Sequence, residues 1–303
     1  MSTPKPFRGV VSPRTKRFPL EAALLTSGLK DLMGLPGLLC VGAVLQASLL
    51  LVLPTRWAVL PAYGFALYGI LSTAIQVFFP STSQFDKDVI RGRVAGALPN
   101  KSYDPSRPDE KPLFGPTPAA EQIVCFHLGL RYSHPLGMFA PGAAEMHRHI
   151  ATMYASLRQE SEKYGCLGST FWRTGGRESK NAGMAVFYFR SVEGLHAFAH
   201  DEAHRAGWDW FNGWLKKTGH THLGIFHETF AAPAGQWETI YGDMPPTLLG
   251  AANNVKVLNE QTGEEEYVVP LVDYKHSQLR SKYGRMGWTD GKYHLDGDRG
   301  VKA

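Results

Sequence analysis

The sequence LGIFHETFAAPAGQWETIY, from Leu223 to Tyr241, is the stretch from which the fold can be worked out. Its first half is rich in residues that favour β-strands, and Pro233-Ala234-Gly235 ends the run. Side chains alternate along a strand, which divides this run into one face with Leu223, Ile225, His227 and Thr229 and another with Gly224, Phe226, Glu228 and Phe230. Both faces are largely apolar, which predicts a central strand covered on both sides.

The strand carries an imidazole and a carboxylate on opposite faces, and burying such groups costs free energy unless they are paired or used. In one interpretation His227 is a hydrogen-bonded core residue and Glu228 anchors a loop. In the other, His227 faces a substrate cavity. Glu228 lies between Phe226 and Phe230, two aromatic residues suited to packing under helices. We therefore expect His227 on the cavity side.

Composition sets broad limits on the class of protein. The chain has 303 residues, 44% of them hydrophobic, and a formal net charge of +5. Much of the excess of Lys and Arg lies in the first thirty residues, a pattern that indicates a membrane flank better than a nucleic-acid groove. We expect no nucleic-acid partner. The three cysteines are scattered, so the sequence predicts neither a disulfide framework nor a zinc site.

Two uncharged apolar runs, 35–53 and 57–79, are separated only by Pro54-Thr55-Arg56. Each is close to the roughly 20 residues that cross a bilayer. The pattern predicts a basic cytosolic lead over 1–30 and two transmembrane helices within 31–80. Positive residues flank the pair, so we expect both termini in the cytosol. The alternative is a hairpin that enters one leaflet without crossing.

Residues 81–120 are rich in proline and are predicted to form a linker without regular elements. A soluble domain is expected over 121–250, followed by a polar C-terminal extension over 251–303. Within the domain, hydrophobic periodicity predicts strand, helix, strand, strand, helix, strand, with a turn at Thr174–Arg177 between the second and third strands.

This order of elements indicates an α+β, ferredoxin-like fold. One face of the sheet takes the helices, and the other carries aromatic residues that a monomer would leave bare. We therefore expect a homodimer in which two sheets pack face to face as an α/β barrel.

Other chemistries lack support in the sequence. There is no glycine-rich dinucleotide fingerprint, no P-loop and no Gly-x-Ser-x-Gly nucleophile motif. His196, His200 and His204 share a helix face, but the first and third are roughly 12 Å apart at the helical rise, so one metal ion cannot use all three. We expect a solvated helix face there and no metal site. His127 shares a strand face with Ile123 and Cys125 and could meet His227 across the sheet.

Four motifs within residues 121–250 match those of a known family. They are Tyr188-Phe189-Arg190-Ser191, Trp208-x-x-Phe211-Asn212, Gly224-Ile225-Phe226-His227-Glu228-Thr229 and Tyr241-Gly242-Asp243-Met244-Pro245-Pro246. In these motifs the domain resembles the fungal antibiotic-biosynthesis-type (ABM-like) monooxygenases of secondary metabolism, the family that includes the fumagillin-pathway monooxygenase. The two apolar runs also resemble those of fungal members. The resemblance implies a dimeric α/β barrel and an oxygenase that acts on an apolar polyketide or terpenoid.

Under this interpretation the protein is a membrane-anchored monooxygenase of the endoplasmic reticulum with a cytosolic catalytic domain. Molecular oxygen is the co-substrate, no cofactor is needed, and the reaction oxygenates or oxidatively cleaves the substrate. Expected catalytic residues are His227, as base or hydrogen-bond donor, with Asn212 and Tyr241 orienting an oxygen atom. Substrate contacts are expected from Trp172, Phe187, Tyr188 and Glu228.

Two alternatives remain open at this stage. The first is a haem-dependent enzyme of the same fold with a histidine axial ligand. The second is a membrane-tethered, non-catalytic dimer that binds a lipophilic molecule, in which His227 and Glu228 are structural.

Overall fold

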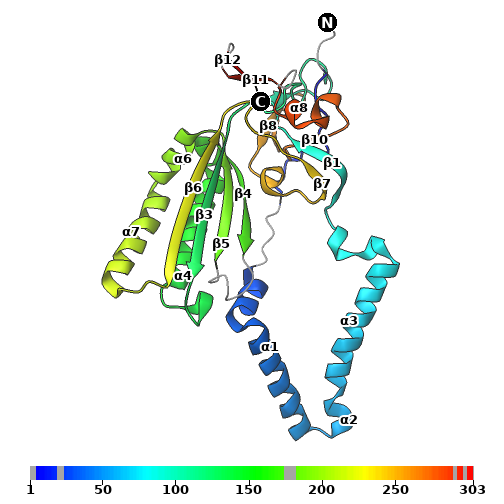
Figure 1. Cartoon of the computed structure of the whole chain (residues 1–303), viewed down its shortest axis with the longest axis vertical. Helices are drawn as coiled ribbons and strands as arrows, with labels where there is room; N and C mark the ends of the chain where they lie inside the picture. The colour runs from blue at the N-terminus through cyan, green and yellow to red at the C-terminus, as the bar shows by residue number, and fades with distance from the viewer. Residues whose placement is uncertain (1–4, 19–23, 174–181, 289–291, 296–298, 303) are drawn as a thin grey trace.

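A computed structural model describes residues 5–18, 24–173, 182–288, 292–295 and 299–302 (Figure 1). The turn predicted at Thr174–Arg177 lies outside these residues. Two apolar helices form the N-terminal hairpin, a four-stranded sheet with helices forms the middle of the chain, and three smaller sheets of described residues lie at the end where both termini are found.

The middle of the chain has the predicted ferredoxin-like order. Its elements are β3 (Ile123–Tyr132), α4 (Ala143–Gln159), α5 (Ser161–Tyr164), β4 (Cys166–Arg173), β5 (Gly183–Phe189), α6 (Val192–Ala199), α7 (Glu202–Thr218) and β6 (Leu223–Ala232). The sheet has the order β4-β5-β3-β6, and all neighbouring strands are antiparallel. The α+β, ferredoxin-like prediction is thereby confirmed. Gly165 and Gly219 follow helices with positive φ, as expected of residues just past a helix end.

Strand β6 lies at the edge of this sheet, so the prediction that it is a central strand is wrong. Its neighbour β3 is the strand that pairs on both sides. Apolar residues on both faces of β6 suggested a central strand covered on both sides, but the residues from Phe226 to Phe230 are exposed on both faces of this edge strand.

Helices α4, α6 and α7 cover one face of the sheet, which we call the helix face (Figure 1). Its core is built largely from strands β3 and β5, where Val124, Phe187 and Phe189 are at most 3% exposed. Leu157 of α4 and Phe198 of α6 pack against them. Burial of these side chains is the main stabilising contribution in this layer.

We call the opposite side of the sheet the open face. At one end it is covered, because Trp237, Leu249 and Val255 pack against Leu167 and Tyr188. These covering residues follow β6 in the sequence, and η5 (Leu248–Ala251) is among their elements. Among the described residues, no helix lies over the rest of the open face (Figure 1).

The segments before and after this domain form two three-stranded sheets and one two-stranded sheet, which we call the accessory unit. One three-stranded sheet has the order β10-β1-β7, from β1 (Ile90–Gly96), β7 (Tyr241–Met244) and β10 (Leu271–Asp273). The other three-stranded sheet has the order β2-β8-β9, from β2 (Ser102–Tyr103), β8 (Lys256–Asn259) and β9 (Glu264–Tyr267). Its remaining elements are η6 (Ser277–Arg280), α8 (Lys282–Arg285), β11 (Lys292–Leu295) and β12 (Arg299–Lys302).

The accessory unit corrects the prediction that 81–120 lacks regular elements. Strand β1 lies between prolines and finds its partners about 150 and 180 residues further along the chain. The N-terminal residue Phe7 is 5% exposed and packs in the same core as Phe114, Val257 and Val272. The polar extension 251–303 therefore contributes four of the nine buried residues of this small hydrophobic core.

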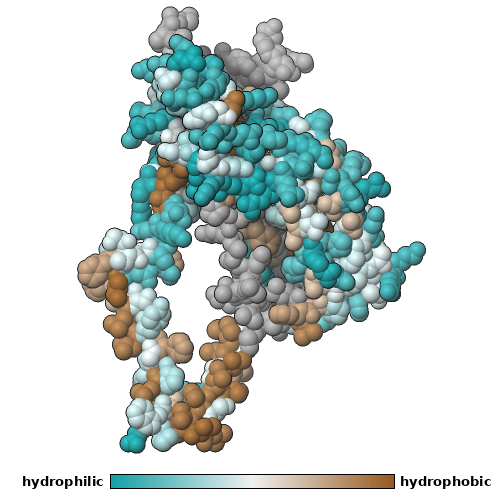
Figure 2. Space-filling view, turned by 180° about the vertical axis from the view of Figure 1, so that it is seen from behind, coloured by the Kyte–Doolittle hydropathy of each residue, from teal (hydrophilic) through white to brown (hydrophobic). Residues whose placement is uncertain are grey.

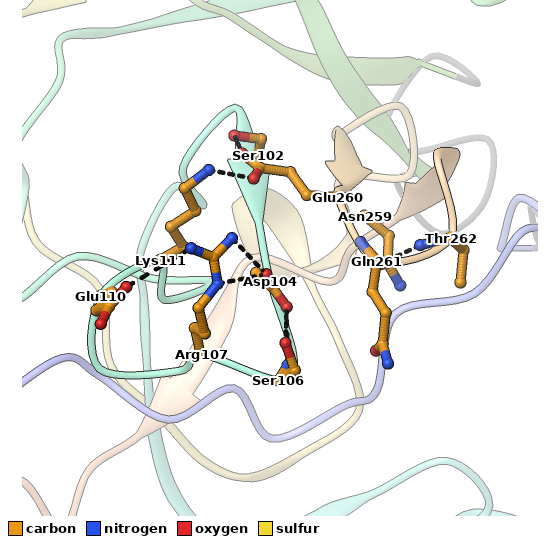
Figure 3. Close-up of polar contacts among 10 residues, drawn as sticks. All are labelled: Ser102, Asp104, Ser106, Arg107, Glu110, Lys111, Asn259, Glu260, Gln261 and Thr262. Atoms are coloured by element: carbon orange, nitrogen blue, oxygen red, sulfur yellow. Dashed lines mark hydrogen bonds and ion pairs between the residues drawn. The ribbon is translucent and has the colours of Figure 1, made fainter.

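Polar contacts also join the two halves of the accessory unit (Figure 3). Ser102 donates a hydrogen bond of 2.8 Å to Glu260, and Lys111 forms an ion pair with the same carboxylate. Asp104 is 6% exposed and accepts hydrogen bonds from Ser106 and Arg107, which hold the pKa of its carboxyl at about 2. These contacts fix the 102–111 loop against the β8–β9 hairpin.

The N-terminal hairpin consists of α1 (Leu24–Val52), α2 (Thr55–Ala58) and α3 (Leu60–Phe78), followed by η1 (Pro80–Thr82) and η2 (Gln84–Asp86). Helix α1 is kinked at Gly34, where φ is 59°. The segments Gly34–Val52 and Thr55–Phe78 are long and apolar enough to cross a membrane. Their side chains are almost all exposed, and Figure 2 shows the hairpin as the most hydrophobic surface in that view.

Candidate active site on the open face of the sheet

The pairing of β3 with β6 decides which side chains share a face. His127 lies opposite Glu228, and Leu128 lies opposite His227. Cys125, His127 and Gly129 of β3 therefore share the open face with Phe226, Glu228 and Phe230 of β6. Tyr188 of β5, opposite Cys125, and Thr170 and Trp172 of β4 belong to the same face.

His227 lies on the helix face, so the prediction that it faces the cavity opposite the helices is wrong. Its ring centroid is 5.7 Å from that of Phe126, which packs in the helix-face core. Phe226 and Phe230 were expected under the helices but lie on the open face. The physical reason is that aromatic residues of β3 and β5 already fill the helix-face core, as the 3% exposure of Phe187 shows. Whether His227 takes part in turnover stays a prediction.

The open face carries a row of half-exposed aromatic side chains. Phe226, Phe230 and Trp172 are 49%, 53% and 46% exposed. The Phe226 ring lies directly over Gly129, because a Cβ on that glycine would be 1.8 Å from the ring. Trp172 is held by a hydrogen bond of 3.2 Å from its indole nitrogen to the Thr170 hydroxyl. Together these side chains form an apolar floor suited to a flat, apolar molecule.

A chain of polar groups crosses this floor from β5 to β6. The Tyr188 hydroxyl lies close enough to the Cys125 thiol for each group to influence the pKa of the other. The Cys125 Sγ is 3.4 Å from His127 Nε2, and His127 Nδ1 is 3.8 Å from Glu228 Oε2. The Phe230 ring stands edge-on to the imidazole, with centroids 5.5 Å apart. Burial raises the pKa of both the Cys125 thiol and the Tyr188 phenol, so both groups keep their protons near neutral pH.

The other expected site residues are dispersed. Phe187 is buried under the helices, so only Tyr188 of this pair reaches the open face. Asn212 is exposed on α7 and donates to the Trp208 carbonyl of its own helix. Tyr241 lies in the accessory unit, where its hydroxyl accepts a hydrogen bond from the Gly250 amide, close enough to Tyr188 to influence its pKa. The expected substrate contacts Trp172, Tyr188 and Glu228 all lie on the open face.

The three histidines singled out in the sequence, His196, His200 and His204, lie in and between α6 and α7. Within the described part of the chain, no group of three or more His, Cys, Asp or Glu side chains is arranged to hold a metal ion. His204 instead packs edge-on against Phe198, and burial lowers the pKa of its imidazole.

Sequence reasoning missed the pairing of His127 with Glu228. The spacing of Cys125 and His127 placed both on one strand face, and this part of the arrangement was visible in the sequence. Their contact with Glu228 depends on the register between strands almost a hundred residues apart. Nothing in the local pattern of either strand fixes that register.

Comparison with known proteins places the chain in a family. A family model described as "Monooxygenase af470-like" matches residues 123–249. Monooxygenase af470 of Aspergillus fumigatus is 35% identical over 271 residues, which cover 89% of this chain and 94% of that protein.

Two solved structures are similar at lower identity. A variant of SnoaB from Streptomyces nogalater, described as a cofactor-independent oxygenase, is 15% identical, covers 36% of this chain and 92% of its own, and has a TM-score of 0.26. An aldoxime dehydratase is 16% identical, covers 45% and 38%, and has a TM-score of 0.33. Matches this distant support no inference about the reaction.

The identity to the Aspergillus protein extends far beyond the sheet domain, through the accessory unit and into the N-terminal segments, because it spans nearly nine-tenths of the chain. Similarity of this length and degree means that the protein belongs to the monooxygenase af470-like family and is a monooxygenase.

Proposed function

We propose that the protein oxygenates an apolar small molecule, such as a polyketide or terpenoid intermediate of secondary metabolism, on the open face of its sheet. The observation that carries the proposal is the aromatic floor of Phe226, Phe230 and Trp172, with His127 and Glu228 at its centre. An apolar site with a few convergent polar groups is typical of small-molecule binding.

The proposed reaction needs no resident cofactor, because the substrate supplies the electrons. For a carbon acid with a CH₂ group, the balance is R₂CH₂ + O₂ → R₂C=O + H₂O. A base removes one proton, the carbanion transfers electrons to dioxygen, and the peroxide formed loses water when the second proton leaves carbon. The protein must bind the substrate, accept and return protons, and exclude bulk water. The missing dinucleotide fingerprint is consistent with this chemistry.

A second copy of the chain would complete the site. The floor is open to solvent beyond the part covered by Trp237 and Leu249, and half-exposed aromatic residues are unusual on the surface of a monomer. Two such sheets packed face to face would bury the aromatic rows and enclose the polar chain. We therefore propose a homodimer with the substrate between the sheets.

The hairpin would hold this dimer at a membrane, which we propose is that of the endoplasmic reticulum, with the catalytic domain in the cytosol. Support comes from the two exposed apolar spans and from the positive residues that flank them. Helix α1 contacts η3 (Gly137–Phe139), a loop of the sheet domain with Leu136 and Phe139 50% and 60% exposed. An apolar substrate dissolved in the bilayer would have a short path to the floor.

The proposal can be tested with anthrone, an apolar carbon acid whose oxidation gives anthraquinone and water. The full-length protein in phosphatidylcholine nanodiscs should take up dioxygen and form anthraquinone faster than empty nanodiscs. One ¹⁸O atom from labelled dioxygen should appear in the product. A requirement for added flavin or NADPH, or a Soret band in the purified protein, would contradict the cofactor-free reaction. An anthrone rate no higher than that of empty nanodiscs would contradict the proposed substrate class.

A further inference from the structure

The two faces of the sheet each carry a histidine, and only one of these lies in a chain of proton-bearing groups. His127 lies between the Cys125 thiol and the Glu228 carboxylate, at 3.4 Å and 3.8 Å. His227 lies on the other face against Phe126. We propose that His127 is the proton acceptor of the open face, that Glu228 positions it, and that the Cys125 thiol covers its basic nitrogen until substrate arrives. This inference rests on the proposed function for its substrate and goes beyond it in assigning the base.

The arrangement selects one tautomer of the imidazole. Glu228 lies beside Nδ1, and a carboxylate there favours a proton on Nδ1. The lone pair is then on Nε2, which is the nitrogen next to Cys125 Sγ. Because burial raises the pKa of Cys125, the thiol keeps its hydrogen and can donate it to Nε2. The Tyr188 phenol lies next to the same thiol and also keeps its proton, because burial raises its pKa.

A thiol is a suitable cover for a base because it is a weak hydrogen-bond donor. A substrate with an acidic C–H or O–H group can displace it from Nε2 with little loss of free energy. The proton then moves from substrate to Nε2, and the imidazolium faces the Glu228 carboxylate. The proton returns to the peroxide, so the cycle leaves Cys125 and His127 unchanged.

The charge environment of His127 is simple among the described residues. Cys125 and Arg131 belong to its own strand, Tyr188 faces it from β5, and Glu228 from β6, whereas β4 contributes the uncharged Thr170 and Trp172. Glu228 is 63% exposed and the His127 side chain 26% exposed. The imidazole is thus accessible from the open face, and the nearest carboxylate is on the side away from its basic nitrogen.

The first test needs no substrate. Full-length protein in nanodiscs is treated with iodoacetamide at neutral pH, and modification of Cys125 is followed by peptide mass spectrometry. Since the thiolate is the reacting form, loss of a neighbouring base should slow modification by about tenfold in His127→Gln. The control His196→Gln changes an exposed histidine of α6 and should leave the rate unchanged. Equal rates in His127→Gln and the original protein would overturn the proposal, because the imidazole would then not accept the thiol proton.

The second test separates the base from its positioning residue by anthrone oxidation. His127→Gln should lower kcat by about 100-fold or more, the usual scale of general-base help, with KM nearly unchanged. Glu228→Gln keeps an oxygen that can accept from Nδ1–H, so it should retain several times more activity than Glu228→Ala. The control Glu202→Gln should match the original protein. Equal loss in both Glu228 variants, or loss confined to KM, would overturn the positioning role.

These outcomes are distinct from failure of the proposed function. If the original protein does not oxidise anthrone, the proposed substrate class fails, while the iodoacetamide result still decides whether His127 accepts a proton. If anthrone is oxidised and His127→Gln keeps full kcat, the oxygenase proposal stands and the assignment of the base is wrong.

Discussion

The two faces of the β4-β5-β3-β6 sheet use aromatic residues for different purposes. On the helix face, Phe187 and Phe189 are almost fully buried against α4 and α6. On the open face, Phe226 and Phe230 are about half exposed beside an ionisable pair. Adjacent residues in one strand, such as Phe187 and Tyr188 of β5, therefore face the core on one side and the proposed binding surface on the other. The difference shows that hydrophobicity alone does not distinguish a core side chain from one on a candidate site. What distinguishes them is whether another layer of the fold covers the side chain.

The largest expected difference in stability is between two single variants, each of which removes an aromatic side chain from one face of the sheet. Phe187→Ala removes a side chain that is 3% exposed and should lower the free energy of unfolding by about 3–5 kcal/mol. Phe230→Ala removes one that is 53% exposed and should cost less than about 1 kcal/mol in the monomer. Urea unfolding followed by circular dichroism measures both.

The same pair of variants sharpens the comparison if dimerisation is also measured. Phe230→Ala should weaken the homodimer in sedimentation experiments, because the open face is the proposed interface, whereas Phe187→Ala should not act on the interface directly. Equal losses of unfolding free energy would show that both faces are covered alike in the monomer.

An intermediate effect is expected at Gly129, where the two strands of the floor meet. Gly129→Ala would place a Cβ 1.8 Å from the Phe226 ring and should cost about 1–3 kcal/mol through displacement of that ring. Adding Phe226→Ala should restore part of the loss, which a double-mutant cycle measures. Gly242→Ala is a matched strand control, since nothing lies within 4 Å of its added Cβ. Additive losses at Gly129 and Phe226 would show that the ring does not lie over the glycine.

The smallest expected effect is a pH dependence that belongs to the helix face. Burial is the largest cause that lowers the pKa of His204 below its ordinary value of 6.5, and the neighbouring His227 and His200 add to this lowering. The unfolded chain then binds a proton at a higher pH than the folded protein. Above pH 6.5 the His204 imidazole is neutral in both states, and the free energy of unfolding keeps its full value. As the pH falls from 6.5 toward the folded pKa, the unfolded chain takes up the proton first and the free energy of unfolding decreases. Urea unfolding at several pH values should show a flatter dependence in His204→Gln, and an unchanged slope would contradict this assignment.

Much of the fold could be predicted from the sequence because it depends on local patterns. Hydrophobic periodicity gave the order of elements in the sheet domain, and Gly165 and Gly219 mark two helix ends. Strand β1 escaped prediction because its partners are far away in the chain and its proline-rich surroundings are typical of a linker. The division of the chain into a lead, an anchor, a sheet domain and flanking segments stays a prediction as to where each part can fold alone.

The candidate site was only partly predictable for a related reason. Alternation along β6 correctly separated His227 from Glu228, but alternation cannot say which layer covers each side. The pairing of His127 with Glu228 is a property of strand register and appears only in three dimensions. Residue type alone was enough to select the candidate substrate contacts Trp172, Tyr188 and Glu228. It could not distinguish Asn212 from the other exposed residues of α7.

The most direct test of the account is a comparison of His127→Gln with His227→Gln in anthrone oxidation by the full-length protein in nanodiscs. The two substitutions are chemically identical and lie on opposite faces of adjacent strands. If the chemistry takes place on the open face, His127→Gln should lower kcat by about 100-fold or more and His227→Gln by far less. A larger loss in His227→Gln, with both proteins equally folded, would place the reaction between the sheet and its helices and contradict the account.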